Sequence, residues 1–144
     1  MVLGQLKPKD FDFWTFLHTR WNDMDSLGHV NHTAFLSYME TARVDTYIQL
    51  GFEGINKRID KSTILANIDI TYLAQLGHPS FLKIGHRIIR VVTKSYDLIS
   101  GIFLQPDNKH VCSAYFKLIS FNYKKNKTIL VQDKIRYNCR PLEK

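Results

Sequence analysis

Residues 19–43 read TRWNDMDSLGHVNHTAFLSYMETAR, and they set the architecture expected for the whole chain. A polar turn over residues 22–28 leads directly into a pattern typical of a long helix over residues 31–50. Asn31 is suited to cap the first turn of that helix, and Gly51 to follow its last turn. The apolar stripe of the helix has spacings of three and four residues: Phe35, Leu36, Met39, Ala42, Thr46, Tyr47 and Leu50.

Outside this helix the sequence has the two-residue period of β-strands. One short run, residues 11–21, precedes the helix, and an alternating run at residues 64–75 follows a connector at residues 53–61. Turns then separate three longer runs, so we expect these to pair as antiparallel hairpins. The three runs are residues 81–93, 96–104 and 109–123, and a turn at residues 124–127 leads to a last short strand at residues 128–131.

This element order predicts an α+β fold in one domain over residues 1–144. A single long helix with a broad apolar stripe needs a surface to cover, and an antiparallel sheet curled around it provides that surface. The free edges of such a sheet favour dimerisation.

The composition excludes several classes of protein. With 44% hydrophobic and 23% charged residues, the chain has a globular composition, not a disordered or fibrous one. No apolar run approaches the ~20 residues of a membrane span. The first residues also lack the apolar core of a signal peptide, so we expect a cytoplasmic protein. Cys112 and Cys139 are expected as reduced thiols.

The charge is distributed unevenly along the chain. The formal net charge is +7, and residues 51–144 carry all of the excess, since acidic residues outnumber basic ones in residues 1–50. Such a basic part suits an anionic partner: nucleic acid, an anionic membrane surface, a phosphorylated ligand or an acidic protein. The basic residues are interspersed along strands, without a zinc-finger, helix-turn-helix or aromatic RNA-binding pattern. We therefore expect no nucleic-acid partner.

The turn and the helix start carry the candidate chemistry. Backbone N–H groups of the first turn, near His32 and Thr33, have no partner within the helix and can stabilise a developing oxyanion. Asp25 is close enough in sequence to lie beside them. An exposed aspartate is ionised at neutral pH and can act as a nucleophile or as a base toward water. A purely turn-forming role for Asp25 is the alternative.

The run R-W-x-D-x-D-x-x-G-H-V-N at residues 20–31, with the long helix and strands that follow, resembles the hot-dog-fold acyl-CoA thioesterases of the 4-hydroxybenzoyl-CoA thioesterase type. The resemblance implies an antiparallel sheet wrapped around one long central helix. It implies homodimers that often pair into homotetramers, with the active site at the dimer interface. The implied reaction is hydrolysis of an acyl or aryl thioester of coenzyme A to free acid and CoA. No cofactor is implied, because coenzyme A is part of the substrate.

Residue by residue, the resemblance makes Asp25 the catalytic aspartate and the backbone N–H of His32 the donor that polarises the thioester carbonyl. Gly28, His29 and Asn31 match the residues that shape the site between these two. The expected substrate-binding residues lie beyond the motif. They are Phe35, at a position where Tyr is frequent, Glu40 near the acyl group, and Arg87, Arg90 and Lys94 for the phosphates of coenzyme A.

Several alternatives remain open at this stage. Glu40 and Arg43, three residues apart on the helix, can instead form an ion pair that fixes the helix against the sheet. Asp23 is expected to be structural and to bond turn backbone or Arg20. No metal is expected, because ligation by the turn would need a tight, unusual loop. Two other functions also remain: a thioesterase for acyl carrier protein, and a non-catalytic domain that binds acyl-CoA or a protein.

Overall fold

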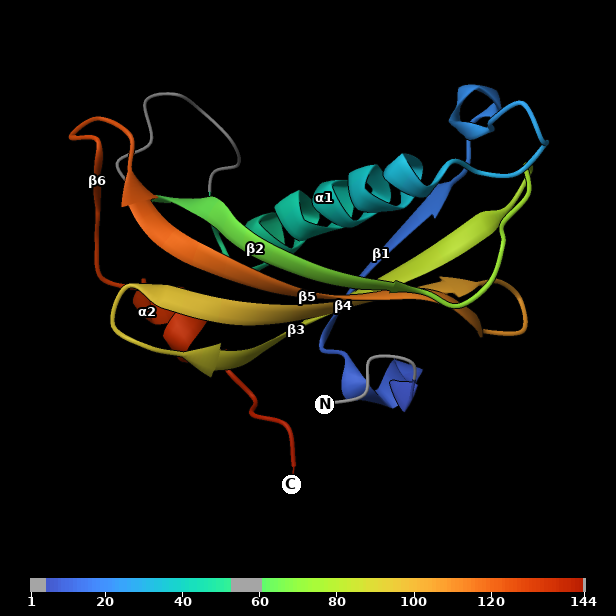
Figure 1. Cartoon of the computed structure of the whole chain (residues 1–144). Coiled ribbons are helices and arrows are strands. Elements are labelled where there is room, and N and C mark those ends of the chain that lie inside the picture. The colour runs from blue at the N-terminus through green and yellow to red at the C-terminus, as the bar shows by residue number, and fades with distance from the viewer. Residues whose placement is uncertain (1–4, 53–60, 144) are drawn as a thin grey trace.

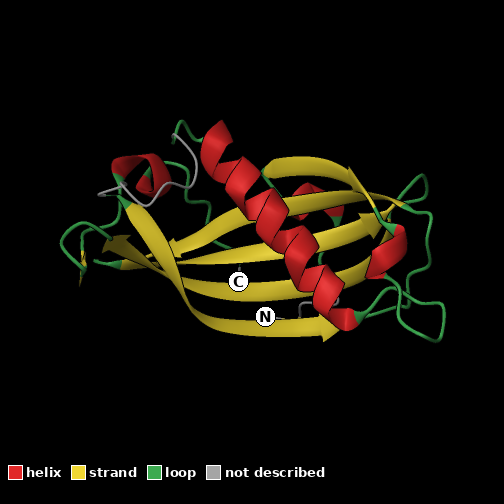
Figure 2. Ribbon diagram, turned by 90° about the horizontal axis from the view of Figure 1, so that it is seen from above, coloured by secondary structure: helices red, strands yellow, loops and turns green. Residues whose placement is uncertain are grey.

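The computed structural model describes residues 5–52 and 61–143. One long helix lies across the concave face of a curved antiparallel sheet (Figures 1 and 2). This is the α+β arrangement predicted from the sequence, with the sheet wrapped around the helix. The predicted connector at residues 53–61 lies outside the described residues except for Lys61.

The sheet has the strand order β1-β3-β4-β5-β2, and β6 extends it beside β5. All of these neighbours pair antiparallel. The predicted helix and the hairpin-linked strands are confirmed. The short helices η2, η3 and α2 were not predicted. The elements are η2 (Pro8–Asp10), β1 (Phe13–His18), η3 (Trp21–Asp23), α1 (His32–Gln49), β2 (Ser62–Tyr72), β3 (Phe81–Val91), β4 (Ser95–Leu104), β5 (Lys109–Asn122), β6 (Lys127–Thr128) and α2 (Asp133–Arg136).

Local signals fix both ends of α1. The Asn31 side chain accepts a 3.0 Å hydrogen bond from the Thr33 N–H, the N-cap predicted from the sequence. Gly51 follows the helix with φ +100°, a left-handed conformation that glycine adopts without a steric penalty. The concave face of the sheet receives Met39 and Ala42 of α1, which are completely buried in the main core.

The convex face of the sheet is closed at its centre by Phe11. Gly85 and Gly101 face each other on β3 and β4, and a Cβ atom on either would lie 2.6 Å from the Phe11 side chain. Phe11 therefore leaves the strand predicted at residues 11–21 and packs edge-on against Trp14 and Phe103. This explains why β1 begins only at Phe13. The last strand is also shorter than predicted, since only Lys127 and Thr128 pair with β5.

The C-terminal segment completes the edge of β3 that β1 does not reach. The Arg140 N–H donates to the Ile88 carbonyl at 2.8 Å, and Cys139 forms a parallel bridge to Ile88. The Arg140 guanidinium also holds the Asp12 carboxylate at 2.7 Å. Cys139 and Cys112 are both free thiols. No helix of the described residues is long and apolar enough to span a membrane.

Candidate active site

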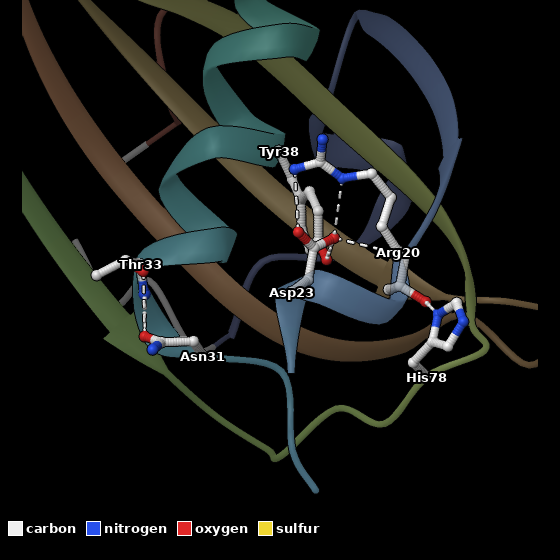
Figure 3. A network of polar contacts seen from close by, with 7 residues as sticks. Arg20, Asp23, Asn31, Thr33, Tyr38 and His78 are labelled. Carbon is white, nitrogen blue, oxygen red and sulfur yellow. Dashed lines mark hydrogen bonds and ion pairs between the residues drawn. The ribbon is translucent and has the colours of Figure 1, made fainter. Parts of the chain in front are cut away.

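A buried carboxylate organises the loop between β1 and α1. Asp23 is 6% exposed and accepts hydrogen bonds from the Tyr38 hydroxyl at 2.6 Å, the Arg20 backbone N–H at 2.9 Å and the Arg20 guanidinium at 3.0 Å (Figure 3). Burial raises the pKa of Asp23, but hydrogen bonds from Tyr38 and Arg20 and the charge of Arg20 outweigh it and leave the pKa below its usual value. Asp23 is thus an ionised anchor, as the sequence predicted for its pairing with Arg20.

The base of the loop is tied to the start of β3. The Thr19 hydroxyl lies 2.8 Å from His78 Nδ1 and accepts a 2.9 Å hydrogen bond from the Ser80 N–H. Figure 3 shows His78 beside this end of the loop. The exposed Trp21 ring packs edge-on against His78. Together with the hydrogen bonds of Asp23, these contacts hold the loop in place at Thr19 and at Asp23.

Asp25 lies in a tight turn at the exposed end of the loop. Its N–H donates to the His29 carbonyl at 2.7 Å, and its Oδ1 accepts from the backbone N–H groups of Leu27 at 2.9 Å and His29 at 3.3 Å. Gly28 closes the turn with φ +80°, a conformation strained for any residue with a side chain. Asp25 is exposed, and among the described residues nothing donates to its Oδ2.

The helix start follows this turn directly along the chain and carries a backbone donor. Asn31 accepts from the Thr33 N–H, and the Ala34 N–H donates to the Asn31 carbonyl at 2.9 Å. Within the described ranges, no group accepts a hydrogen bond from the His32 N–H. The Asn31 N–H itself donates to the Asp23 carbonyl at 2.8 Å, which joins the helix start to the anchored loop. The site thus combines an exposed carboxylate with an unsatisfied amide at a positive helix end.

Tyr72, at the end of β2, covers this helix start and was not predicted as a site residue. Its hydroxyl donates to the His32 carbonyl at 3.1 Å, and its ring lies edge-on to His32 and to Phe35. Tyr38 was missed in the same way, because it lies inside the helical pattern with no local sign of its bond to Asp23. Tyr72 ends the alternating run at residues 64–75, and this position was the only signal the sequence offered.

The predicted substrate-binding residues on α1 have separate environments. Phe35 is 3% exposed and packs inward, whereas Glu40 is exposed. The alternative prediction of a Glu40–Arg43 ion pair is wrong within the described residues. The Arg43 guanidinium instead lies over the Phe116 ring, 5.2 Å from its centroid, because that side chain turns toward the core.

The three predicted phosphate-binding residues do not meet Asp25 within one chain. Arg87 is 3% exposed and donates to the carbonyls of Asp10, Arg140 and Pro141, so it offers no free guanidinium surface to a phosphate. This corrects its predicted role. Burial, together with the charge of Arg140, lowers the pKa of Arg87 from its usual value. Arg90 and Lys94 are exposed near the end of β3, at the opposite end of the sheet from the start of α1 (Figure 1).

His86 is buried beneath α1 and takes no part in this site. It is 0% exposed, and neither ring nitrogen has a partner among the described residues. Burial and then the nearby charge of Arg43 lower its pKa to about 3, so it is neutral. The described residues contain no group of three His, Cys, Asp or Glu side chains that could hold a metal ion.

Solved structures with this architecture include three informative relatives. The PA2801 protein from Pseudomonas aeruginosa, a proposed thioesterase, has 28% identity and a TM-score of 0.78 over 87% of this chain and 95% of its own. The DHNA-CoA thioesterase from Staphylococcus aureus has 18% identity and a TM-score of 0.74, over 82% of this chain and 79% of its own. A Thermus thermophilus thioesterase, solved with coenzyme A and zinc, has 21% identity and a TM-score of 0.76 over 90% and 98%.

These similarities identify the curled sheet and long helix as the hot-dog fold of thioesterases. Among curated proteins, none matches the sequence with significance. The thioesterase-like superfamily matches residues 19–139, a range that runs from the start of the Asp25 loop to the segment on the edge of β3. That range covers most of the chain and includes every candidate site residue described above. The chain belongs to the thioesterase-like superfamily.

Proposed function

We propose that this protein hydrolyses acyl or aryl thioesters of coenzyme A, with Asp25 as the catalytic carboxylate. The observation that carries the proposal is the exposed Asp25 carboxylate in a turn held by its own Oδ1, next to a helix start with an unsatisfied His32 N–H. Membership of the thioesterase-like superfamily supports thioester hydrolysis. The CoA named for the Thermus thermophilus relative supports coenzyme A as the thiol carrier.

In the proposed mechanism the thioester carbonyl oxygen accepts a hydrogen bond from the His32 N–H. This donor and the helix dipole stabilise the negative charge that develops on the oxygen. The free carboxylate oxygen of Asp25 either attacks the carbonyl carbon, to form an acyl anhydride, or removes a proton from an attacking water. In both routes the C–S bond breaks and coenzyme A leaves as the thiolate. In the first route the thiolate takes a proton from solvent, and in the second it takes the proton that Asp25 removed from the attacking water, which returns Asp25 to its ionised form. Hydrolysis of the anhydride in the first route regenerates Asp25.

We propose that the active form is a homodimer. One long edge of β2 is unpaired in the described sheet, and the exposed side chains Leu65, Tyr72 and Leu73 lie on or just after this strand. Tyr72 also contacts the helix start, so pairing at this edge would bring a second chain next to the site. Sedimentation equilibrium should give twice the 16.9 kDa of the chain, or four times for a pair of dimers. A monomer with full activity would contradict this proposal.

The test of the function is thiol release from a panel of CoA thioesters, from acetyl to palmitoyl together with benzoyl, the aryl member closest to the 4-hydroxybenzoyl type. Wild type and Asp25→Asn are assayed in parallel. Asparagine keeps the Oδ1 acceptor of the turn but loses the charge, so the fold is expected to persist. We expect turnover on at least one substrate and a loss of about a hundredfold or more in the variant.

Matched melting temperatures for wild type and Asp25→Asn would show that the loss is chemical. If Asp25→Asn keeps near-full activity on the best substrate, the catalytic role of Asp25 is wrong. If no CoA thioester is hydrolysed, the same panel on acyl carrier protein separates the two carriers. Binding of acyl-CoA without turnover would instead favour a non-catalytic acyl-CoA-binding domain.

A further inference from the structure

A cavity lies on the convex face of the sheet, away from Asp25. It has a volume of about 630 Å³, within the range of small-molecule sites. Its walls come from the end of β3, the middle of β5, α2 and the C-terminal segment. Figure 1 shows α2 at the end of the sheet opposite the Asp25 loop, with the C-terminal segment running from there beneath the sheet. The residues that carry the argument are Ile89, Arg90, Tyr115, Arg136, Cys139 and Leu142.

A β-bulge builds this cavity. The register of β3 on β4 shifts between Ile88 and Arg90, so Ile89 is the extra residue. Regular alternation would send Ile89 and Arg90 to opposite faces, yet both line the same cavity. The bulge therefore places an apolar residue next to a cation, and bulges commonly re-aim side chains in this way near binding sites.

The chain fixes the wall of this cavity firmly. The buried Arg87 guanidinium donates to the Arg140 carbonyl at 2.7 Å and to the Pro141 carbonyl. The Arg140 side chain binds Asp12 on its other side. Because this segment is held from two directions, Cys139 and Leu142 form a preorganised wall that a ligand would not have to order.

The polar groups of the cavity favour an anion. Arg90 is exposed and has no ion-pair or hydrogen-bond partner among the described residues. Arg136 donates to the Val92 carbonyl at 3.1 Å through one nitrogen, and its other donors are free to bind a ligand. The acidic Asp97 on β4 pairs with Arg90 on β3, but its carboxylate accepts a hydrogen bond from the Tyr115 hydroxyl. Burial and this bond raise the pKa of Tyr115 to about 12, so the phenol is neutral.

We propose that this cavity binds a small carboxylate with an apolar chain, its head group held by Arg90 and Arg136. The chain would lie on the apolar floor that Ile89, Tyr115 and Leu142 provide. Two guanidinium groups match a carboxylate through charge-assisted, bidentate hydrogen bonds. This site is independent of the hydrolytic function assigned to Asp25, and it remains whether or not that assignment holds.

The probe for the test is octanoate, with octanol as the neutral ligand of equal chain length. NMR spectra of the full chain should show octanoate shifting the amide signals of residues 89–91 and 139–142. Cys139 gives a second measurement, since a ligand in the cavity should slow its alkylation by iodoacetamide. The other thiol, Cys112, is fully buried, and burial raises its pKa to about 12, so it should not react.

The decisive variant is Arg90→Gln combined with Arg136→Gln. Its apparent affinity for octanoate should fall by about tenfold or more. Lys109→Gln combined with Lys117→Gln removes the same charge from exposed positions outside the cavity and should leave the affinity within about twofold.

Each of four results would overturn the proposal. Octanoate at millimolar concentrations could leave the amide signals of the cavity unchanged. Octanol could bind as tightly as octanoate, or the double arginine variant could keep its affinity, which would mean that the arginines do not select an anion. Free coenzyme A could shift the same signals when octanoate does not, which would make the cavity a phosphate subsite instead.

Discussion

The Tyr38 hydroxyl donates a 2.6 Å hydrogen bond to the buried Asp23 carboxylate, which joins the second turn of α1 to the loop that carries Asp25. This bond lies beneath the exposed carboxylate, two residues away along the chain. Burial, together with this hydrogen bond, raises the pKa of Tyr38 well above its ordinary value, and the same bond helps to lower the pKa of Asp23. The bond therefore couples the stability of the loop to the position of the candidate catalytic group.

Removing this hydroxyl should destabilise the protein. In Tyr38→Phe a buried charged acceptor loses a donor, so the free energy of unfolding should fall by about 1–3 kcal/mol. Urea denaturation at neutral pH measures this change. Tyr123→Phe is the matched control, because the half-exposed Tyr123 hydroxyl donates only to the Thr63 carbonyl, at 3.1 Å. Equal losses of unfolding free energy in both variants would show that the Tyr38–Asp23 bond contributes no more to stability than the bond of Tyr123.

The turn conformation at Gly28 should matter for activity. Gly28→Ala puts a side chain on a residue with φ +80°, at a cost of about 1–2 kcal/mol from backbone strain, although the added Cβ atom meets nothing within 4 Å. The strain should displace Asp25 and reduce thiol release on the best substrate. Gly77→Ala also adds a Cβ in open space, but without a positive φ, and should be nearly neutral in both stability and activity. A fully active Gly28→Ala enzyme would argue against a fixed turn.

The variant Asn31→Asp tests the catalytic role of the helix start without removing the helix cap. Asn31→Asp keeps an oxygen acceptor for the Thr33 N–H, so the cap and the melting temperature should be retained. Its added carboxylate opposes the negative charge that develops on the thioester oxygen, and kcat should fall by roughly tenfold or more. Ser37→Asp adds the same charge at an exposed position further along α1 and should reduce kcat much less. Similar kcat values for both variants would exclude an oxyanion role for the helix start.

The buried His86 predicts a pH dependence of stability. Its pKa is about 3 in the folded protein and ordinary in the unfolded chain, so only the unfolded chain takes up a proton between these values. Stability contributed by neutral His86 is therefore present above about pH 6.5 and is lost as the pH falls below it. The loss approaches about 1.4 kcal/mol for each pH unit.

Urea denaturation between about pH 6.5 and pH 4.5 measures this slope. His86→Leu should flatten it, whatever its effect on stability at neutral pH. His18→Gln replaces an exposed histidine and should leave the slope unchanged. An unchanged slope in His86→Leu would mean that other groups account for the acid sensitivity.

The sequence predicted those parts of the molecule that depend on local signals. The periodicity, the Asn31 cap and Gly51 defined α1 to within a residue at each end. The turn at Asp25 and the Asp23–Arg20 contact were also accessible, since their partners are within four residues along the chain. The role of Asp25 in catalysis stays a prediction that the Asp25→Asn assay decides.

Contacts between distant parts of the chain were not predictable in this way. Arg87 has the sequence context of a solvated strand residue, and it is buried only because carbonyls more than 50 residues away fold over it. The four residues of α2 have no helical pattern of their own, and this short helix packs into the core through the buried Ile135. The alternative prediction paired Arg43 with Glu40 along the helix, but in the folded chain its guanidinium packs on the Phe116 ring of β5.

The ion pair between Asp12 and Arg140 brings the first and last segments of the described chain together. These residues are 128 positions apart, yet they touch at 2.7 Å, so the chain enters and leaves the sheet at one place. A circular permutant that joins the segment before Asp12 to the segment after Arg140, and opens instead at the exposed turn of residues 123–126, should therefore keep the same sheet. The arrangement of the strands in space would then not depend on where along this sequence the chain is opened.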